Sequence, residues 1–228
     1  MSDLPQAVLF DMDGLLVDTE PVWSIAESEL ADSLGGVFTP ELKAAIVGTR
    51  LDVAIPTILR WYGAPDGDDD VTRTSQWVLA RMVELFAGPL TVLPGVHDLL
   101  AELREVGVPV ALVSSSYRVL VDAVLAHHLG PFDVTLAGDE VLRAKPDPEP
   151  YLTAAARLGV DPTRCVVLED SPSGVASGEA AGCAVVAVPS VAGVVFEPRK
   201  RRLVRSSLEG LTAGELGAPA LWFGRVVV

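Results

Sequence analysis

Two aspartates separated by one residue stand where a short apolar run meets a glycine. The run Ala7–Phe10 is followed by Asp11, Met12, Asp13 and Gly14. Four consecutive apolar residues predict a buried strand, and side chains two apart on an extended chain share a face. Two carboxylates held that close need a cation or a shared proton to offset their repulsion. The pair therefore predicts a site at the C-terminal tip of a strand, where open α/β sheets bind ligands.

Two other kinds of site or turn also use closely spaced aspartates. A calcium loop counted from Asp11 would need glycine at its sixth position and glutamate at its twelfth, but Leu16 and Val22 stand there. A turn whose aspartates cap a helix stays open on this segment alone.

Three later segments also carry side chains suited to chemistry. Ser114 follows an apolar run, Lys145 stands in an Ala-Lys-Pro-Asp-Pro segment, and Glu169 with Asp170 follow another apolar run. Each has an ordinary structural explanation, as a helix cap, a surface turn or a helix start. Because the C-terminal ends of parallel strands meet at one sheet edge, the four segments together predict a single site.

The elements that must position these residues fall into two parts. After residue 90, short apolar runs alternate with helical patterns, which is typical of a parallel sheet flanked by helices. The expected strands are 7–10, 109–113, 134–137, 165–168 and 184–188, and the expected helices of this part are 96–106, 119–129, 149–158 and 172–181. Between Glu20 and Pro89 the apolar spacing is helical, and the acidic run 65–70 is expected to be a solvated loop.

The predicted fold is therefore α/β, with a Rossmann-like parallel sheet core and an inserted α-helical cap domain. We expect residues 1–15 and 91–228 to form the core and residues 16–90 to form the cap. Both connections between the two parts lie next to the strand tip that carries Asp11, so the cap can act as a lid over that tip.

Composition limits the partners. The 228 residues include 17 basic and 31 acidic side chains, a formal charge of −14, and half of the chain is hydrophobic. An acidic surface repels nucleic acid and anionic lipid, so neither is expected as a partner. A small phosphorylated metabolite would need local positive charge or a metal to enter.

Other features indicate a cytoplasmic enzyme. No apolar stretch approaches the roughly 20 residues of a membrane span, and the start Met-Ser-Asp lacks the basic and hydrophobic segments of a secretory signal. Cys165 and Cys183 lie in or beside apolar runs and are expected to be buried, reduced thiols. The basic run 199–202 is expected to be a solvated loop, and the apolar tail 220–228 to pack on the core or on a partner.

With these four segments in this order, the chain resembles a haloacid dehalogenase superfamily phosphatase of the helical-cap branch, up to about Leu216. The resemblance implies that Asp11 is a nucleophile that becomes an aspartyl-phosphate. It implies that Asp13 protonates the leaving oxygen and then activates water. Two carboxylates with different protonation states are then needed.

The same resemblance implies a Mg²⁺ cofactor. Asp11, the backbone carbonyl of Asp13 and Asp170 are the implied ligands, and Glu169 is implied as a ligand either directly or through water. Magnesium prefers a few carboxylate oxygens together with water and phosphate.

The remaining implied roles concern the phosphoryl group. Lys145 would offset the combined charge of Asp11 and the phosphate. Ser114 would donate its hydroxyl to a phosphoryl oxygen, assisted by the following backbone N–H groups, including that of Ser115. Ser116 is expected to cap the next helix.

Within this family, Asp13 argues against dehalogenation, since a halide leaves without a proton. The segment containing Glu20 and Trp23 resembles phosphatases of 2-deoxyglucose 6-phosphate and hexitol phosphates, whereas β-phosphoglucomutase carries a histidine at the position of Trp23. Trp23 is either a substrate contact or cap core, and Arg50 is either a ligand for distal polar groups of the substrate or a solvated side chain.

We therefore expect a Mg²⁺-dependent phosphatase of small phosphomonoesters, of sugar or polyol phosphate type, that is a monomer or weak dimer. The alternatives are a β-phosphoglucomutase-type isomerase and a non-catalytic binding protein on the same fold.

Overall fold

The computed structural model of this chain describes residues 4–46, 48–190 and 193–217. Its core contains a six-stranded sheet in the order β5-β4-β1-β6-β7-β8. All neighbouring strands in it are parallel. The strands are β1 (Ala7–Phe10), β4 (Val110–Val113), β5 (Val134–Leu136), β6 (Cys165–Glu169), β7 (Ala184–Ala187) and β8 (Arg202–Val204). The predicted Rossmann-like sheet is confirmed.

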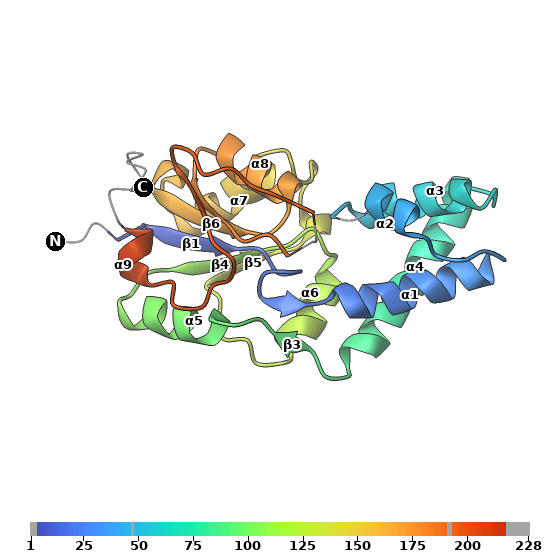
Figure 1. The fold of residues 1–228 in the computed structure, drawn as a ribbon, viewed down its shortest axis with the longest axis horizontal. Helices are drawn as coiled ribbons and strands as arrows, with labels where there is room; N and C mark the ends of the chain where they lie inside the picture. Colours follow the sequence, from blue (N-terminus) through green and yellow to red (C-terminus); the bar gives the residue numbers. More distant parts are fainter. Residues whose placement is uncertain (1–3, 47, 191–192, 218–228) are drawn as a thin grey trace.

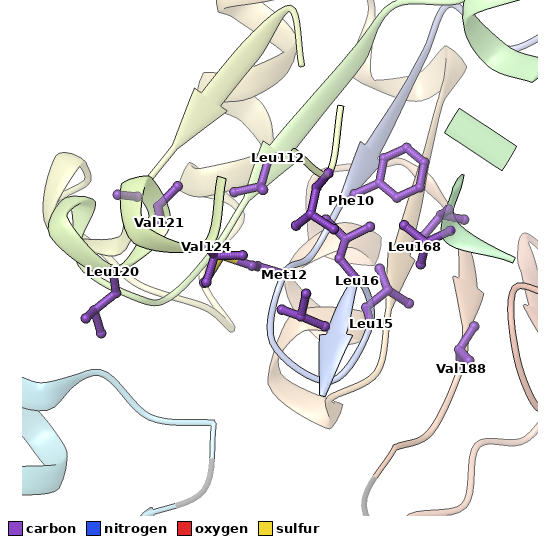
Figure 2. Packing of buried hydrophobic residues seen from close by; sticks show 14 of the residues in the cluster. Phe10, Met12, Leu15, Leu16, Leu112, Leu120, Val121, Val124, Leu168 and Val188 are labelled. Carbon is purple, nitrogen blue, oxygen red and sulfur yellow. The ribbon is translucent and has the colours of Figure 1, made fainter. Parts of the chain in front are cut away.

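The first strand lies between the two strands that carry the other polar tips. Phe10 is in register with Leu112 of β4 and Leu168 of β6. Side chains alternate across β1: Phe10 packs in one buried cluster and Leu9 in another, on opposite faces of the sheet. Figure 2 shows Phe10, Leu112 and Leu168 gathered in the first cluster.

Helices cover both faces of this sheet. Those described after residue 90 are α5 (Val96–Glu105), α6 (Arg118–Leu125), α7 (Glu149–Leu158), α8 (Pro172–Ala180) and α9 (Ala213–Leu216), with short 3₁₀ turns at Gly138–Glu140 and Pro162–Arg164. Helices α5 and α6 add buried residues to the cluster of Phe10, and α7 and α8 to the cluster of Leu9.

A helical part lies beyond the sheet edge where β1 ends (Figure 1). It consists of α1 (Glu20–Ser33), α2 (Pro40–Ile46), α3 (Leu51–Trp61) and α4 (Asp68–Phe86). The chain leaves the sheet through β2 (Val17–Asp18) and returns through β3 (Thr91–Val92), and these two strands pair antiparallel. The sequence pattern did not indicate this pairing, which joins the two connections side by side.

Several local expectations were wrong. Asp68 begins α4, so the run 65–70 is only partly loop; aspartates in a first helical turn interact favourably with the helix dipole. The helix expected to reach residue 129 ends at Leu125. Arg202 of the basic run starts β8, which pairs with β7, and its side chain forms an ion pair with Glu179, so this end of the run is not a solvated loop.

Other expectations are confirmed or lie outside the described residues. Cys165 and Cys183 are buried, free thiols. In the part of the chain described here, no helix combines the length and apolar character that a membrane crossing requires. The tail 220–228 lies outside the described residues.

Candidate active site

The four predicted segments meet at one edge of the sheet. Asp11 follows β1, Ser114 follows β4, and Glu169 ends β6, while Lys145 reaches in from the loop between β5 and α7. The Lys145 ammonium lies 2.6 Å from Asp11 Oδ1 and 2.7 Å from Glu169 Oε1. All four residues are buried. The side chains of Asp11 and Lys145 thus meet although they stand 134 positions apart in sequence.

Lys145 is held by three acceptors. Its ammonium donates to Asp11, to Glu169 and to the backbone carbonyl of Val113, the last at 2.9 Å. Burial alone would lower the pKa of Lys145, but the Asp11 and Glu169 carboxylates raise it above the ordinary value. Lys145 is therefore a fixed positive charge against Asp11.

Glu169 is fully enclosed and engaged on both oxygens. Its Oε1 accepts hydrogen bonds from Lys145 and from the Tyr151 hydroxyl, and its Oε2 accepts from the N–H of Asp170 and from the N–H and hydroxyl of Ser171. A Cβ on Gly174 would lie 1.6 Å from Glu169 Oε1, so the first turn of α8 leaves this carboxylate no room to move. This arrangement favours contact of Glu169 with a metal through water over direct ligation.

Three buried carboxylates form a group suited to a metal. One oxygen each of Asp11, Glu169 and Asp170 lies within 4.8 Å of the others. Burial, followed by the charges of neighbouring carboxylates, raises the pKa of Asp170 to about 7. Burial likewise raises the pKa of Asp11 well above its usual value, although Lys145 opposes the rise. Three acids against one ammonium leave excess negative charge, which a divalent cation with oxygen ligands would balance.

Asp13 lies outside that group and is surrounded by hydroxyls. Thr19 donates to its Oδ1 at 2.8 Å, while Ser114 and Ser116 donate to its Oδ2 at 3.2 and 2.9 Å. The prediction that Ser116 caps the next helix was wrong, because α6 begins at Arg118 with Tyr117 at the N-cap. The three hydroxyls hold the Asp13 carboxyl in place beside Asp11.

These groups border a cavity of about 320 Å³ between the sheet edge and the helical part. The sheet side contributes Asp11, Asp13, Lys145, Asp170 and Ser115. Ser114 is not among the described lining residues; its hydroxyl also accepts from the N–H of Ser116, and its donation to a phosphoryl group stays a prediction. The helical side contributes Glu20 and Trp23, whose contact with a substrate stays a prediction, together with Glu27 and Lys43. Trp23 also packs against the apolar core, so its position is compatible both with a contact to substrate and with a role in the core of the cap.

Arg50 lies elsewhere. Its guanidinium pairs with Asp52 and donates to the backbone carbonyls of Gly138 and Val141, at 3.0 and 3.3 Å. Among the described residues, Arg50 does not line the cavity that contains Asp11. Its prediction as a substrate ligand is untested, but in this structure it joins the start of α3 to the loop after β5.

Sequence reasoning missed several residues of the site. Thr19 closes the first motif and is fully buried, and Ser190, after the tip of β7, donates to Asp170 Oδ2. Thr19 stands at the end of the first motif and Ser190 stands just after a predicted strand. These positions in the sequence could have marked both residues as members of the site. Tyr151, Glu27 and Lys43 lie on helices with no local signal, because only packing brings them to the site.

Comparison with known proteins agrees with this geometry. A protein-family model described as haloacid dehalogenase-like hydrolase matches residues 5–182. Hexitol phosphatase B of Escherichia coli O157:H7 is 34% identical over 220 residues, covering 92% of this chain and 96% of that protein.

Two solved structures are also similar. A variant of CbbY from Rhodobacter sphaeroides in complex with xylulose-1,5-bisphosphate has a TM-score of 0.82 at 27% identity and covers 93% of this chain and 99% of that one. β-Phosphoglucomutase from Clostridium difficile has a TM-score of 0.77 at 26% identity and covers 91% and 93%. The chain therefore belongs to the haloacid dehalogenase-like hydrolases and is a phosphoric monoester hydrolase of that family.

Proposed function

We propose that this protein is a Mg²⁺-dependent phosphatase that hydrolyses small phosphomonoesters of sugars or polyols through an aspartyl-phosphate on Asp11. One observation carries the proposal. Asp11 lines the cavity while a buried ammonium at 2.6 Å holds one of its oxygens, and the Asp13 carboxyl lines the same cavity. This arrangement supports Asp11 as the nucleophile and Asp13 as a separate acid, because both border one cavity.

In the first step, an Asp11 carboxylate oxygen attacks phosphorus, and the bond from phosphorus to the ester oxygen breaks. Asp13, in its protonated form, gives its proton to the departing oxygen, so that an alcohol rather than an alkoxide leaves. Thr19, Ser114 and Ser116 keep the Asp13 carboxyl oriented for this transfer.

In the second step, the Asp13 carboxylate takes a proton from water, and the water oxygen attacks phosphorus. The bond from phosphorus to Asp11 breaks, and phosphate and the original Asp11 carboxylate are restored. Lys145 offsets the negative charge shared by Asp11 and the phosphoryl oxygens throughout.

Asp11 and Asp170, with Glu169 beside them, would hold the metal. When bound, Mg²⁺ supplies positive charge that offsets the charge of the phosphoryl oxygens. The residues fit it because they are oxygen donors with an excess of negative charge. We also propose that the helical residues 16–90 act as a cap domain over the core formed by residues 1–15 and 91–228. The cytoplasmic location and the oligomeric state, a monomer or weak dimer, stay predictions.

The substrate class is supported by the relatives and the cavity. The similarity to hexitol phosphatase B and the polar side chains of α1 and α2 in the cavity favour a hydroxylated substrate. A β-phosphoglucomutase-type activity is the second candidate, supported by the similarity to that enzyme. Trp23 in the cavity disfavours it, because indole has neither the acceptor nor the titratable proton of imidazole.

The test is phosphate release from a panel of sugar and polyol phosphates, with Mg²⁺ and with EDTA, by the native protein and by Asp11→Asn. We expect Mg²⁺-dependent release that falls at least about a thousandfold in the variant. Acid-quenched native protein should carry a phosphoryl group on the peptide containing Asp11. The exposed Asp122→Asn on α6 is the matched control and should keep full activity. Undiminished turnover by Asp11→Asn would refute the proposal, and faster conversion of glucose 1-phosphate to glucose 6-phosphate than release of phosphate would favour the mutase.

A further inference from the structure

Three charged side chains form one wall of the cavity, on helices α1 and α2. Lys43 Nζ lies 2.9 Å from Glu20 Oε2 and 2.9 Å from Glu27 Oε2. Within the described residues of α1–α4, these are the charged side chains that line the cavity. Two carboxylates against one ammonium leave this wall, which we term the Glu20–Lys43–Glu27 wall, with a net charge of −1.

The wall is shielded enough from solvent for its charge to act on a bound molecule. The side chains of Glu27 and Lys43 are 11% and 23% exposed, and that of Glu20 is 39% exposed. Interactions between partly buried charges are screened less by salt than those between surface charges. Lys43 already shares its ammonium with two acids, so a bound molecule that accepts its remaining N–H must lie beside both carboxylates.

We propose that the Glu20–Lys43–Glu27 wall makes the enzyme select phosphomonoesters whose far end is an uncharged hydroxylated chain, and reject those with a second phosphate or a carboxylate there. This inference rests on the proposed function of the site and names its substrate class more closely. A hydroxyl both donates to a carboxylate and accepts from an ammonium, so a neutral polyol satisfies all three side chains.

A second anionic group on the substrate cannot satisfy all three side chains of the wall. Of the three side chains of the wall, only Lys43 can donate to it, and it must then lie beside the two carboxylates that already contact that ammonium. Like charges brought together in this way disfavour a wrong partner. The fold alone does not decide whether a second phosphate is rejected, since the similar CbbY structure holds xylulose-1,5-bisphosphate.

The experiment compares three substrates that differ only at the far end: glucitol 6-phosphate, 6-phosphogluconate and glucitol 1,6-bisphosphate. For the native protein with Mg²⁺, we expect kcat/KM for glucitol 6-phosphate to exceed the other two by at least about tenfold. Glu27→Gln removes one charge at nearly constant shape and should reduce this ratio at least about threefold, chiefly by improving use of the anionic substrates. Glu41→Gln, an exposed acid on α2 that does not line the cavity, should leave the ratio unchanged.

Binding measurements keep the test independent of turnover. Calorimetry on Asp11→Asn should show that the protein binds glucitol 6-phosphate more tightly than the two anionic esters. Adding Glu27→Gln to this variant should reduce the difference in affinity between them. Hydrolysis of all three esters with equal kcat/KM, or an unchanged ratio in a folded Glu27→Gln, would overturn the inference while leaving the phosphatase proposal intact. Absence of phosphate release from every ester would instead overturn the phosphatase proposal and this inference with it.

Discussion

The Tyr151 hydroxyl donates a 2.9 Å hydrogen bond to Glu169 Oε1, the oxygen that also accepts from Lys145. Both Tyr151 and Glu169 are wholly buried, and the Lys145 ammonium lies 5.0 Å from the centre of the Tyr151 ring. Helix α7 thus supports the carboxylate that, with Asp11, holds the site's ammonium. Burial, followed by the Glu169 charge, raises the pKa of Tyr151, so the phenol keeps the proton that it donates.

Removing that hydroxyl is expected to disturb both stability and the site. Tyr151→Phe should lower the free energy of unfolding by about 2 kcal/mol, because a buried charge loses a hydrogen bond. It should also lower kcat and weaken the response of activity to Mg²⁺, because Glu169 Oε1 then loses the hydrogen bond from Tyr151 and keeps the one from Lys145. Chemical denaturation and Mg²⁺ titration of activity measure these effects. Tyr62→Phe, whose hydroxyl donates at an exposed position, is the control; an equal effect of both variants would contradict the role of Tyr151.

Asp13→Asn tests the proton transfer. An amide does not deliver a proton, so kcat for an alkyl phosphate should fall about 10²–10⁴-fold. The fall should be much smaller for p-nitrophenyl phosphate, whose leaving group needs little protonation. Mg²⁺ affinity should change little, because the Asp13 carboxylate lies outside the group of Asp11, Glu169 and Asp170. Equal losses on both esters would refute Asp13 as the acid.

Metal removal should make stability depend on pH in a defined direction. The pKa of Asp170 is raised to about 7, above that of an unfolded aspartate, so the metal-free folded state holds protons that the unfolded state has released. Its free energy of unfolding in EDTA should therefore be largest near pH 4 and fall by about 3 kcal/mol as the pH rises to 7. Mg²⁺ should stabilise the protein more at pH 8 than at pH 5, since it then competes with no protons.

The Asp170→Asn variant is the control for this prediction. It should flatten the fall of stability with pH in EDTA and weaken the response to Mg²⁺. Thermal or urea denaturation across pH measures both. A native protein equally stable at pH 5 and pH 8 in EDTA would show that Asp170 does not titrate as stated.

Arg50 offers a test between two roles. It donates to the carbonyls of Gly138 and Val141, so Arg50→Met should loosen the attachment of α3 to the sheet part. We then expect kcat/KM to fall by about tenfold for a hexitol phosphate and by the same factor for p-nitrophenyl phosphate. Arg60→Met, an exposed substitution on the same helix, should have no effect. A loss confined to the hexitol phosphate would instead support the prediction that Arg50 binds the distal groups of the substrate.

Much of the sheet and of the candidate site could be predicted from local sequence. Buried parallel strands are apolar along their whole length, so β1 and β6 are distinct in the chain, and polar residues at their tips stand out. Strand β8 did not stand out, because Arg202 and its partly buried neighbours lack a continuous apolar run. The first turn of α4 does not stand out from a loop in the sequence, because aspartates are common in both.

What the sequence by itself determined is which polar residues form the candidate site and their order, Asp11 and Asp13, Lys145 and Asp170, since each follows a locally recognisable strand or turn. What only the tertiary structure decided is how they are supported and what they face. Tyr151 reaches Glu169, Glu27 reaches Lys43, and Arg50 turns from the cavity toward the sheet part. These contacts depend on how whole helices pack against one another, and the residues that make them carry no local pattern to mark it.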